Sequence, residues 1–187
     1  MQPFNAKKIF ALIAALVALS SVSCFADSIY MSVASTPYDR QMTRIQPVLV
    51  NSTTAHKENL SIGIVNHWIQ DLRGIPYGFS VEWKTPSEVE KARFADCKGK
   101  AVALYERMHS AGAQNVRLVI GRRTWNSSKT HAWLEWNTAA GNYVLDPTIN
   151  WSACRAADAG SRSYIPLYAY AGSQKYRAAS GTLFAKN

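Results

Sequence analysis

The order in which helical and strand patterns occur constrains the fold of this chain more than any other feature. The longest helical pattern starts at Asp96 or Cys97, keeps one apolar stripe, and stops at Gly112. Strand patterns follow it, and a short polar loop between two of them predicts an antiparallel hairpin. The predicted strands are residues 115–120, 131–136 and 142–145, and the predicted loops are residues 121–129 and 137–141.

Two shorter helical patterns come earlier in the chain. Residues 56–72 keep one apolar face, and Gly74 and Pro76 end that pattern. Thr85 and Glu88 have the spacing of a capping box, which predicts a helix of one or two turns that ends before residue 95. A short strand is expected at residues 80–83. Residues 27–53 are expected to form a mostly irregular arm on the surface.

The first 26 residues have the pattern of a secretory signal peptide. Lys7 and Lys8 precede an uninterrupted apolar run, residues 9–19, and small residues then lead to Ala26. The run is too short to span a bilayer as a stable helix, although a retained membrane anchor is the alternative. Cys24 raises the question of a lipoprotein, but Ser21 stands where a lipobox needs a residue such as leucine. We therefore expect a protein that is periplasmic or secreted.

The net charge of the chain limits the kinds of binding partner that we expect. The net charge is +9, and the basic residues are scattered along the chain. A basic surface favours contact with an acidic cell-envelope surface, although a merely solvated basic surface also explains the charge. Nucleic acid is not expected as a partner of an exported protein. The length after removal of residues 1–26 suits one domain, and we expect a monomer.

Cys97 is the candidate nucleophile because it is the first residue on the buried stripe of its helix. The helix N-terminus and the charges of Lys98 and Lys100 favour the thiolate form, which is the nucleophilic one. Two alternatives stay open at this point. Cys97 could be an inert core residue, or it could form a disulfide with Cys154.

His131 and Asp146 are the candidate partners of this thiol. If Trp136 pairs with Asn142, His131 lies opposite Pro147, and Asp146 is its neighbour. Each residue alone has an ordinary structural explanation, because histidines occur in strands and aspartates start turns. In combination with Cys97, they predict a Cys-His-Asp triad that performs acyl transfer. Late aromatic residues, Tyr164 among them, are interpreted as packing residues.

The residues at these three positions resemble the transglutaminase-like superfamily. The matching segments are Asp96-Cys97 at a helix start, His131-Ala-Trp133 on a strand, and Leu145-Asp-Pro-Thr148 on the next. The segment Trp83-Lys-Thr-Pro-Ser-Glu88, just upstream of Cys97, is similar to the bacterial transglutaminase-like cysteine proteinases. The resemblance implies an α+β fold, papain/transglutaminase-like, with the nucleophile helix packed on an antiparallel sheet. It also implies that residues 56–187 form the catalytic domain, behind a signal peptide at 1–26 and an N-terminal arm at 27–55.

The family roles would make Cys97 the nucleophile, His131 the general base and acid, and Asp146 the residue that orients His131. The implied activity is that of a cysteine protease or amide hydrolase that acts on a protein or peptide through a thioester. The alternatives are an amine-transferring transglutaminase and an inactive binding domain on the same scaffold. Trp83 is a candidate second donor to the oxyanion.

One departure from the subgroup concerns metal ions. Its adhesin-cleaving members carry acidic residues directly after the nucleophile and depend on calcium. Lys98 and Gly99 follow the nucleophile here, and a calcium site needs several oxygen ligands. We therefore expect no metal and no other cofactor.

Overall fold

A single antiparallel sheet organises the part of the chain that the computed structural model describes, residues 29–51, 60–160 and 162–179. The sheet has seven strands in the order β1-β7-β6-β2-β3-β4-β5. The strands are β1 (Tyr30–Ser32), β2 (Val116–Thr124), β3 (His131–Thr138), β4 (Gly141–Leu145), β5 (Cys154–Arg155), β6 (Ser163–Ala171) and β7 (Gln174–Ala178). The helices are α2 (Gln46–Val50), α3 (Ile62–Gly74), α4 (Pro86–Lys91), α5 (Cys97–Ser110) and the 3-10 turn η1 (Ala156–Asp158).

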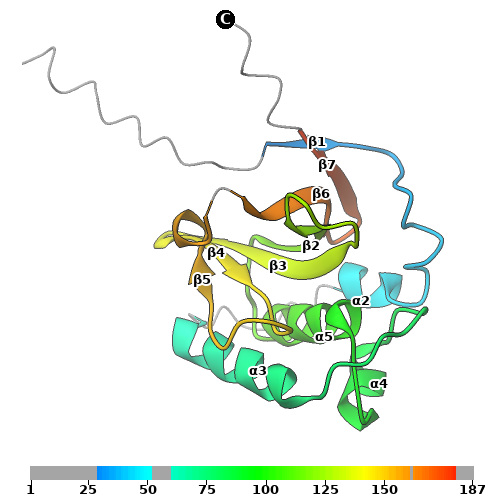
Figure 1. The fold of residues 1–187 in the computed structure, drawn as a ribbon, viewed down its shortest axis with the longest axis vertical. Helices are drawn as coiled ribbons and strands as arrows, with labels where there is room; N and C mark the ends of the chain where they lie inside the picture. The colour runs from blue at the N-terminus through cyan, green and yellow to red at the C-terminus, as the bar shows by residue number, and fades with distance from the viewer. Residues whose placement is uncertain (1–28, 52–59, 161, 180–187) are drawn as a thin grey trace, which may run out of the picture.

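The α-helices lie together on one face of this sheet (Figure 1). Helix α5 packs against β2 and β3, and α3 and α4 pack against α5. The main apolar core lies between these helices and the sheet, and a smaller cluster around Trp133 covers the opposite face. The predicted α+β fold, with the nucleophile helix packed on an antiparallel sheet, is confirmed.

Local capping explains where α4 begins and where α5 begins and ends. The Asp96 side chain accepts a hydrogen bond from the Gly99 N–H at 3.0 Å and caps α5 at its first turn. At the other end Gly112 has a φ of +80°, and the next N–H bonds back to the Met108 carbonyl at 2.9 Å. The capping box predicted at Thr85 is also present and starts α4.

Four details of the predicted elements were wrong. Strand β2 continues to Thr124, so residues 121–124 of the predicted loop 121–129 belong to the strand. Residues 80–83 form no strand. Helix α3 begins at Ile62, because the Ser61 side chain caps it. Residues 56–59, the predicted start of this helix, lie outside the described residues. The predicted loop at residues 137–141 is shorter, since only Ala139 and Ala140 separate β3 from β4. The register between β3 and β4 differs from the predicted one by one residue, because Trp136 pairs with Tyr143 and not with Asn142.

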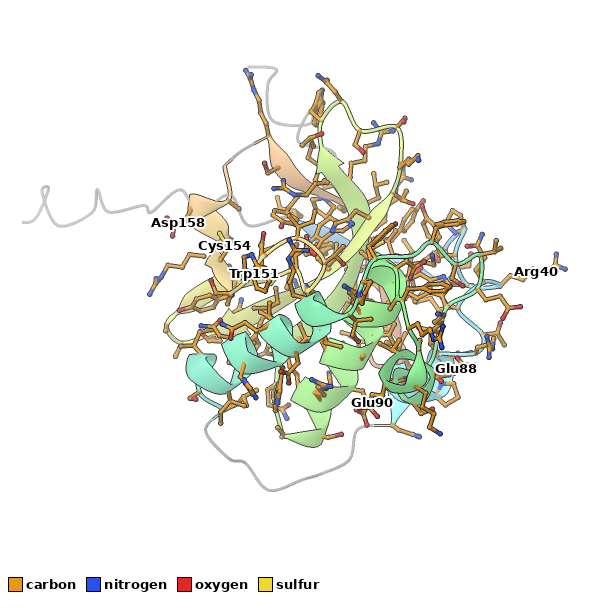
Figure 2. All side chains as sticks on the ribbon, turned by 60° about the horizontal axis from the view of Figure 1, so that its bottom comes forward. Arg40, Glu88, Glu90, Trp151, Cys154 and Asp158 are labelled. Carbon is orange, nitrogen blue, oxygen red and sulfur yellow. The ribbon has the colours of Figure 1, made fainter. Side chains whose placement is uncertain are left out.

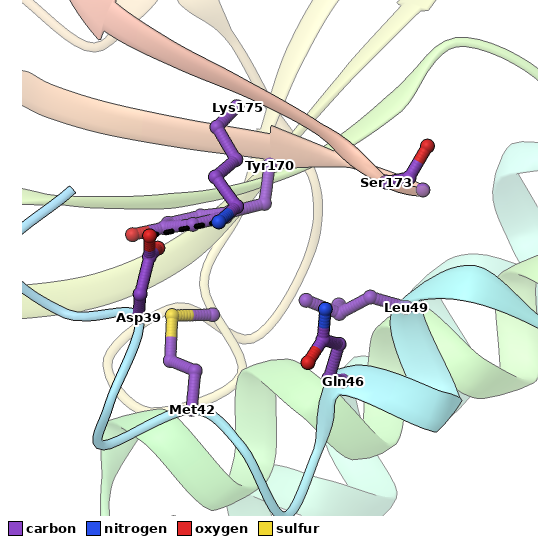
Figure 3. A pocket seen from close by; sticks show the side chains of 8 residues that line it. Asp39, Met42, Gln46, Leu49, Tyr170, Ser173 and Lys175 are labelled. Carbon is purple, nitrogen blue, oxygen red and sulfur yellow. Dashed lines mark hydrogen bonds and ion pairs between the residues drawn. The ribbon is translucent and has the colours of Figure 1, made fainter. Parts of the chain in front are cut away.

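The N-terminal segment is more regular and more buried than the sequence predicted. Strand β1 pairs with β7 at the sheet edge, and Met42 and Leu49 are buried in the main core. Figure 3 shows these two side chains opposite the β6–β7 hairpin, where the Lys175 ammonium and the Asp39 carboxylate are 2.7 Å apart. This segment therefore completes one edge of the sheet and one end of the core.

The predicted signal peptide, residues 1–26, lies outside the described residues. Within the described ranges, the helices are too short or too polar to cross a membrane.

Candidate active site

Cys97 lies at the first position of α5, directly after the capping residue Asp96. Its side chain is largely buried, at 8% exposure. The first N–H groups of a helix have no acceptor within the helix, and they give this end a partial positive charge. The fold therefore places the sulfur where an anion is stabilised.

The hairpin places the other two predicted residues beside one another. His131 is the first residue of β3, and Asp146 directly follows β4. The His131 Nε2 atom lies 2.7 Å from the Asp146 Oδ2 atom. Asp146 is fully buried, and its other oxygen accepts the N–H groups of Thr148 at 3.0 Å and Ile149 at 3.3 Å. The carboxylate is thus fixed by the turn that follows it.

The imidazole also interacts with the Cys97 side chain, so all three predicted residues meet. Because Nε2 faces Asp146, Nδ1 is the ring nitrogen left for the thiol. Burial alone would lower the pKa of His131, but hydrogen bonds to Asp146 and Cys97 outweigh it and raise the pKa to about 9. Burial would likewise raise the pKa of Asp146, but the hydrogen bond and charge of His131 hold it below its usual value. The site thus favours an imidazolium at His131 beside the Asp146 carboxylate.

These shifts predict how stability depends on pH. The folded-state pKa of His131, about 9, lies above its ordinary value of 6.5, so its stabilising contribution is complete below pH 6.5 and is lost as the pH rises to about 9. The Asp146 contribution is present above pH 3.8 and is lost as the pH falls below that value. We expect the free energy of unfolding of the wild type to exceed that of His131→Gln most between pH 3.8 and pH 6.5, and this difference should shrink towards pH 9. Urea unfolding at a series of pH values measures it, and an advantage that grows above pH 6.5 would contradict the assignment.

Close packing at the start of β3 fixes the direction of the imidazole. His131 pairs with Gly121 across the sheet, and Gly121 lies where the pairing of β2 with β6 shifts at a bulge in β6. A Cβ atom at Gly121 would lie 2.2 Å from the Ile165 carbonyl oxygen and 2.5 Å from the Trp133 ring. The Trp133 ring in turn stacks on His131, with centroids 6.1 Å apart. Only glycine allows this approach of β2, β3 and β6.

Tyr164 is a site residue that the sequence analysis missed. Its hydroxyl donates to Asp146 Oδ2 at 3.0 Å, beside the bond from His131. Tyr164 adopts a φ of +54°, which is strained for a bulky residue, and the Arg123 guanidinium lies 4.3 Å from its ring centroid. Burial and the Asp146 charge raise the pKa of the phenol, so it remains a hydrogen-bond donor. No local sequence pattern indicates this role, because Tyr164 comes from β6.

The remaining thiol and histidines lie outside this arrangement. Cys97 and Cys154 are both free, which rules out the disulfide alternative. Figure 2 shows Cys154, the first residue of β5, near Trp151 and Asp158. An open hollow of about 440 Å³ there is lined by Arg123, Ile149, Asn150, Trp151, Ser152, Cys154, Asp158, Ala159 and Tyr164. His67 is exposed and lies 3.8 Å from Asp71, whereas His109 is half-buried and stacks on Tyr105.

Metal-binding groups are not gathered in the part of the chain that the structure describes. No three histidine, cysteine, aspartate or glutamate side chains there converge in a way that could hold a metal ion. The Trp83 Nε1 atom is buried and has no hydrogen-bond acceptor among the described residues. It remains a candidate donor to a substrate.

Comparisons with known proteins bear on the fold of this chain. No family model and no curated protein matches the sequence. Solved structures of LapG from Legionella pneumophila, a transglutaminase-like cysteine protease, do match. The EGTA-treated structure has a TM-score of 0.54 at 12% identity and covers 100% of this chain and 95% of its own. The calcium-bound structure has a TM-score of 0.54 at 14% identity and covers 95% and 92%.

This chain has the transglutaminase-like fold. At 12–14% identity the likeness extends to the fold alone, and the roles of individual residues must be argued from the geometry of the chain itself.

Proposed function

We propose that this protein is an exported cysteine protease or amide hydrolase, with Cys97 as nucleophile, His131 as general base and acid, and Asp146 as the residue that orients His131. One observation carries the proposal: the imidazole bridges the thiol and a fully buried carboxylate. The LapG fold supports a protein or peptide as substrate. Export rests on the pattern of residues 1–26, and a mature protein that begins near Asp27 in the extracytoplasmic fraction would test it.

The reaction follows from the positions of these three groups. The Cys97 sulfur, whose proton has passed to His131, attacks the amide carbonyl carbon. His131 then donates the proton to the leaving amine as the C–N bond breaks, which leaves a thioester on Cys97. Water attacks the thioester while His131 accepts its proton, and the C–S bond breaks to release the acid. The Asp146 carboxylate holds the imidazole in one tautomer and stabilises the imidazolium throughout.

The negative oxygen of each tetrahedral intermediate needs hydrogen-bond donors. The Cys97 N–H is suitable because it belongs to the first turn of α5. Trp83 Nε1 is the candidate second donor, since it is buried and has no other acceptor among the described residues. These donors stabilise the charge only as it develops, which is how they would lower the barrier.

Hydrolysis and amine transfer share the thioester, so the test must separate them. We would incubate the purified protein with an unfolded protein substrate and a biotinylated alkylamine, and map the products by mass spectrometry. The proposal expects new chain ends and no incorporated biotin. Incorporated biotin without cleavage would assign a transglutaminase instead, and the absence of both products would favour a binding domain.

A further inference from the structure

The capping residue Asp96, next to the nucleophile, is a buried carboxylate with both oxygens engaged. Oδ1 accepts the Gly99 N–H at 3.0 Å, and Oδ2 accepts the Ser80 N–H at 3.2 Å. Oδ2 also forms an ion pair with the Lys98 ammonium. One of the similar solved structures is calcium-bound LapG, yet a calcium ion needs six to eight oxygen ligands. Asp96 offers no free oxygen, and the Lys98 charge would oppose a second cation, so these residues do not fit calcium.

Lys98 connects three parts of this corner of the molecule. Its Nζ atom pairs with Asp96 and donates to the Ser80 carbonyl at 2.8 Å. It also lies 5.0 Å from the centroid of the Phe79 ring. The Lys98 side chain is only 18% exposed and the Asp96 side chain is fully buried, so water screens this pair far less than a surface pair.

The connected parts include the backbone that carries the nucleophile. The loop before Ser80 is bonded to the residue before Asp96: the Ala95 N–H donates to the Pro76 carbonyl at 3.0 Å, and the Gly78 N–H donates to the Ala95 carbonyl at 3.3 Å. Lys98, which belongs to α5, adds a second connection between the helix and this loop through its bond to the Ser80 carbonyl. The position of the Cys97 N–H, the first of α5, therefore depends on how firmly Asp96 is held.

Charge gives Lys98 a second effect. Without an ammonium, the buried Asp96 carboxylate would be an uncompensated anion one residue from a thiolate, and two anions this close oppose one another. The Lys98 ammonium supplies the positive charge that compensates the Asp96 carboxylate.

We propose that Lys98 is a positioning residue that serves as a built-in cation: it neutralises Asp96, ties the Phe79–Ser80 loop to α5, and makes this corner independent of calcium. The structural role of the Lys98 contacts is independent of the reaction, whereas their effect on Cys97 rests on the proposed function. The two can therefore be tested by separate measurements.

Lys84 provides a matched control. Its Nζ atom also donates to a backbone carbonyl, that of Phe94, at 2.9 Å, and it also lies over a phenylalanine ring, 4.5 Å from the Phe94 centroid. It differs from Lys98 in having no ion pair with Asp96. Lys84→Met and Lys98→Met therefore remove the same kinds of contact, and only the second also removes the neutralising charge.

The experiment compares the wild type, Lys98→Met, Lys98→Arg and Lys84→Met in EGTA and in millimolar calcium. We expect the melting temperature of the wild type to be the same in both. Lys98→Met should lower it by about 5 °C, because breaking a partly buried pair leaves the Asp96 charge uncompensated. It should also slow alkylation of Cys97 by about tenfold or more. Lys98→Arg should restore most of both properties, and Lys84→Met should change neither.

Two results would overturn the proposal. One is a wild-type melting temperature that falls in EGTA or rises with calcium. The other is a Lys98→Met protein that melts and reacts like Lys84→Met. If Lys98→Met does not fold, the calcium arm on the wild type and the rescue by arginine still decide the matter. Loss of stability without any alkylation of Cys97 in the wild type would instead reject the proposed function and leave the structural tie in place.

Discussion

Replacing Cys97 with alanine should abolish amide hydrolysis by this protein, with a fall in kcat on the order of 10⁵-fold or more. Alanine cannot form the thioester, and it leaves His131 and Asp146 with no nucleophile to activate. The same variant should lose the single site of fast labelling by iodoacetamide, which peptide mapping would locate. The fold should survive, because alanine is a good helix former and the cap at Asp96 is unchanged.

Cys154→Ala is the matched control for this experiment. The Cys154 thiol bonds to the Arg155 carbonyl, and burial together with the Asp158 charge raises its pKa, so it is a weak nucleophile. We expect Cys154→Ala to keep wild-type hydrolysis and labelling. If Cys97→Ala retained activity, or if Cys154 carried the fast label, the assignment of the nucleophile would be wrong.

The start of the nucleophile helix was predictable because its causes are local. Asp96 caps α5 within one turn, and Gly112 ends it with a positive φ. The same holds for α4, whose capping box joins residues only three positions apart. Interactions of this range are fully contained in a short stretch of sequence.

The hairpin shows where sequence reasoning fails by a small amount. Its polar loop residues were expected to lie outside the strands, but Thr138 continues β3 and closes the turn: its hydroxyl accepts the Ala140 N–H and donates to the Gly141 carbonyl. The register therefore moves by one residue. The predicted approach of His131 to Asp146 still holds. Both residues lie beyond Leu134 and Leu145, the last pair between β3 and β4, so the shifted register does not fix their separation.

Contacts between distant segments were the least predictable. Residues 80–83 are fixed by the bond from the Ser80 N–H to Asp96 and by burial of Trp83, which replaces the expected strand. Tyr164 reaches Asp146 only because β6 lies beside β2, and strand order cannot be obtained from the periodicity of either strand. The sequence does not reveal that Tyr164 has a φ of +54°, so Tyr164 could not be distinguished from an aromatic residue that only packs.

Replacing Asp146 with asparagine should lower kcat by about 10³- to 10⁴-fold while the fold is retained. The new amide could still accept the Thr148 and Ile149 N–H groups through its oxygen, which would turn its NH₂ group towards His131. That group donates, so the imidazole would have to accept at Nε2 and carry its proton on Nδ1, the nitrogen that must take the thiol proton. The variant would hold the ring in the wrong tautomer and give no charge to stabilise the imidazolium.

Tyr164→Phe separates this effect from the loss of a single hydrogen bond. It removes one donor to Asp146 Oδ2 but leaves the carboxylate and its bond to His131 in place, so we expect a loss of only about tenfold. Steady-state kinetics of both variants on one peptide substrate, with circular dichroism as the check on folding, would measure the difference. A folded Asp146→Asn protein with wild-type kcat would remove Asp146 from the proposed triad. Equal losses in the two variants would mean that packing around the carboxylate, rather than its charge, controls His131.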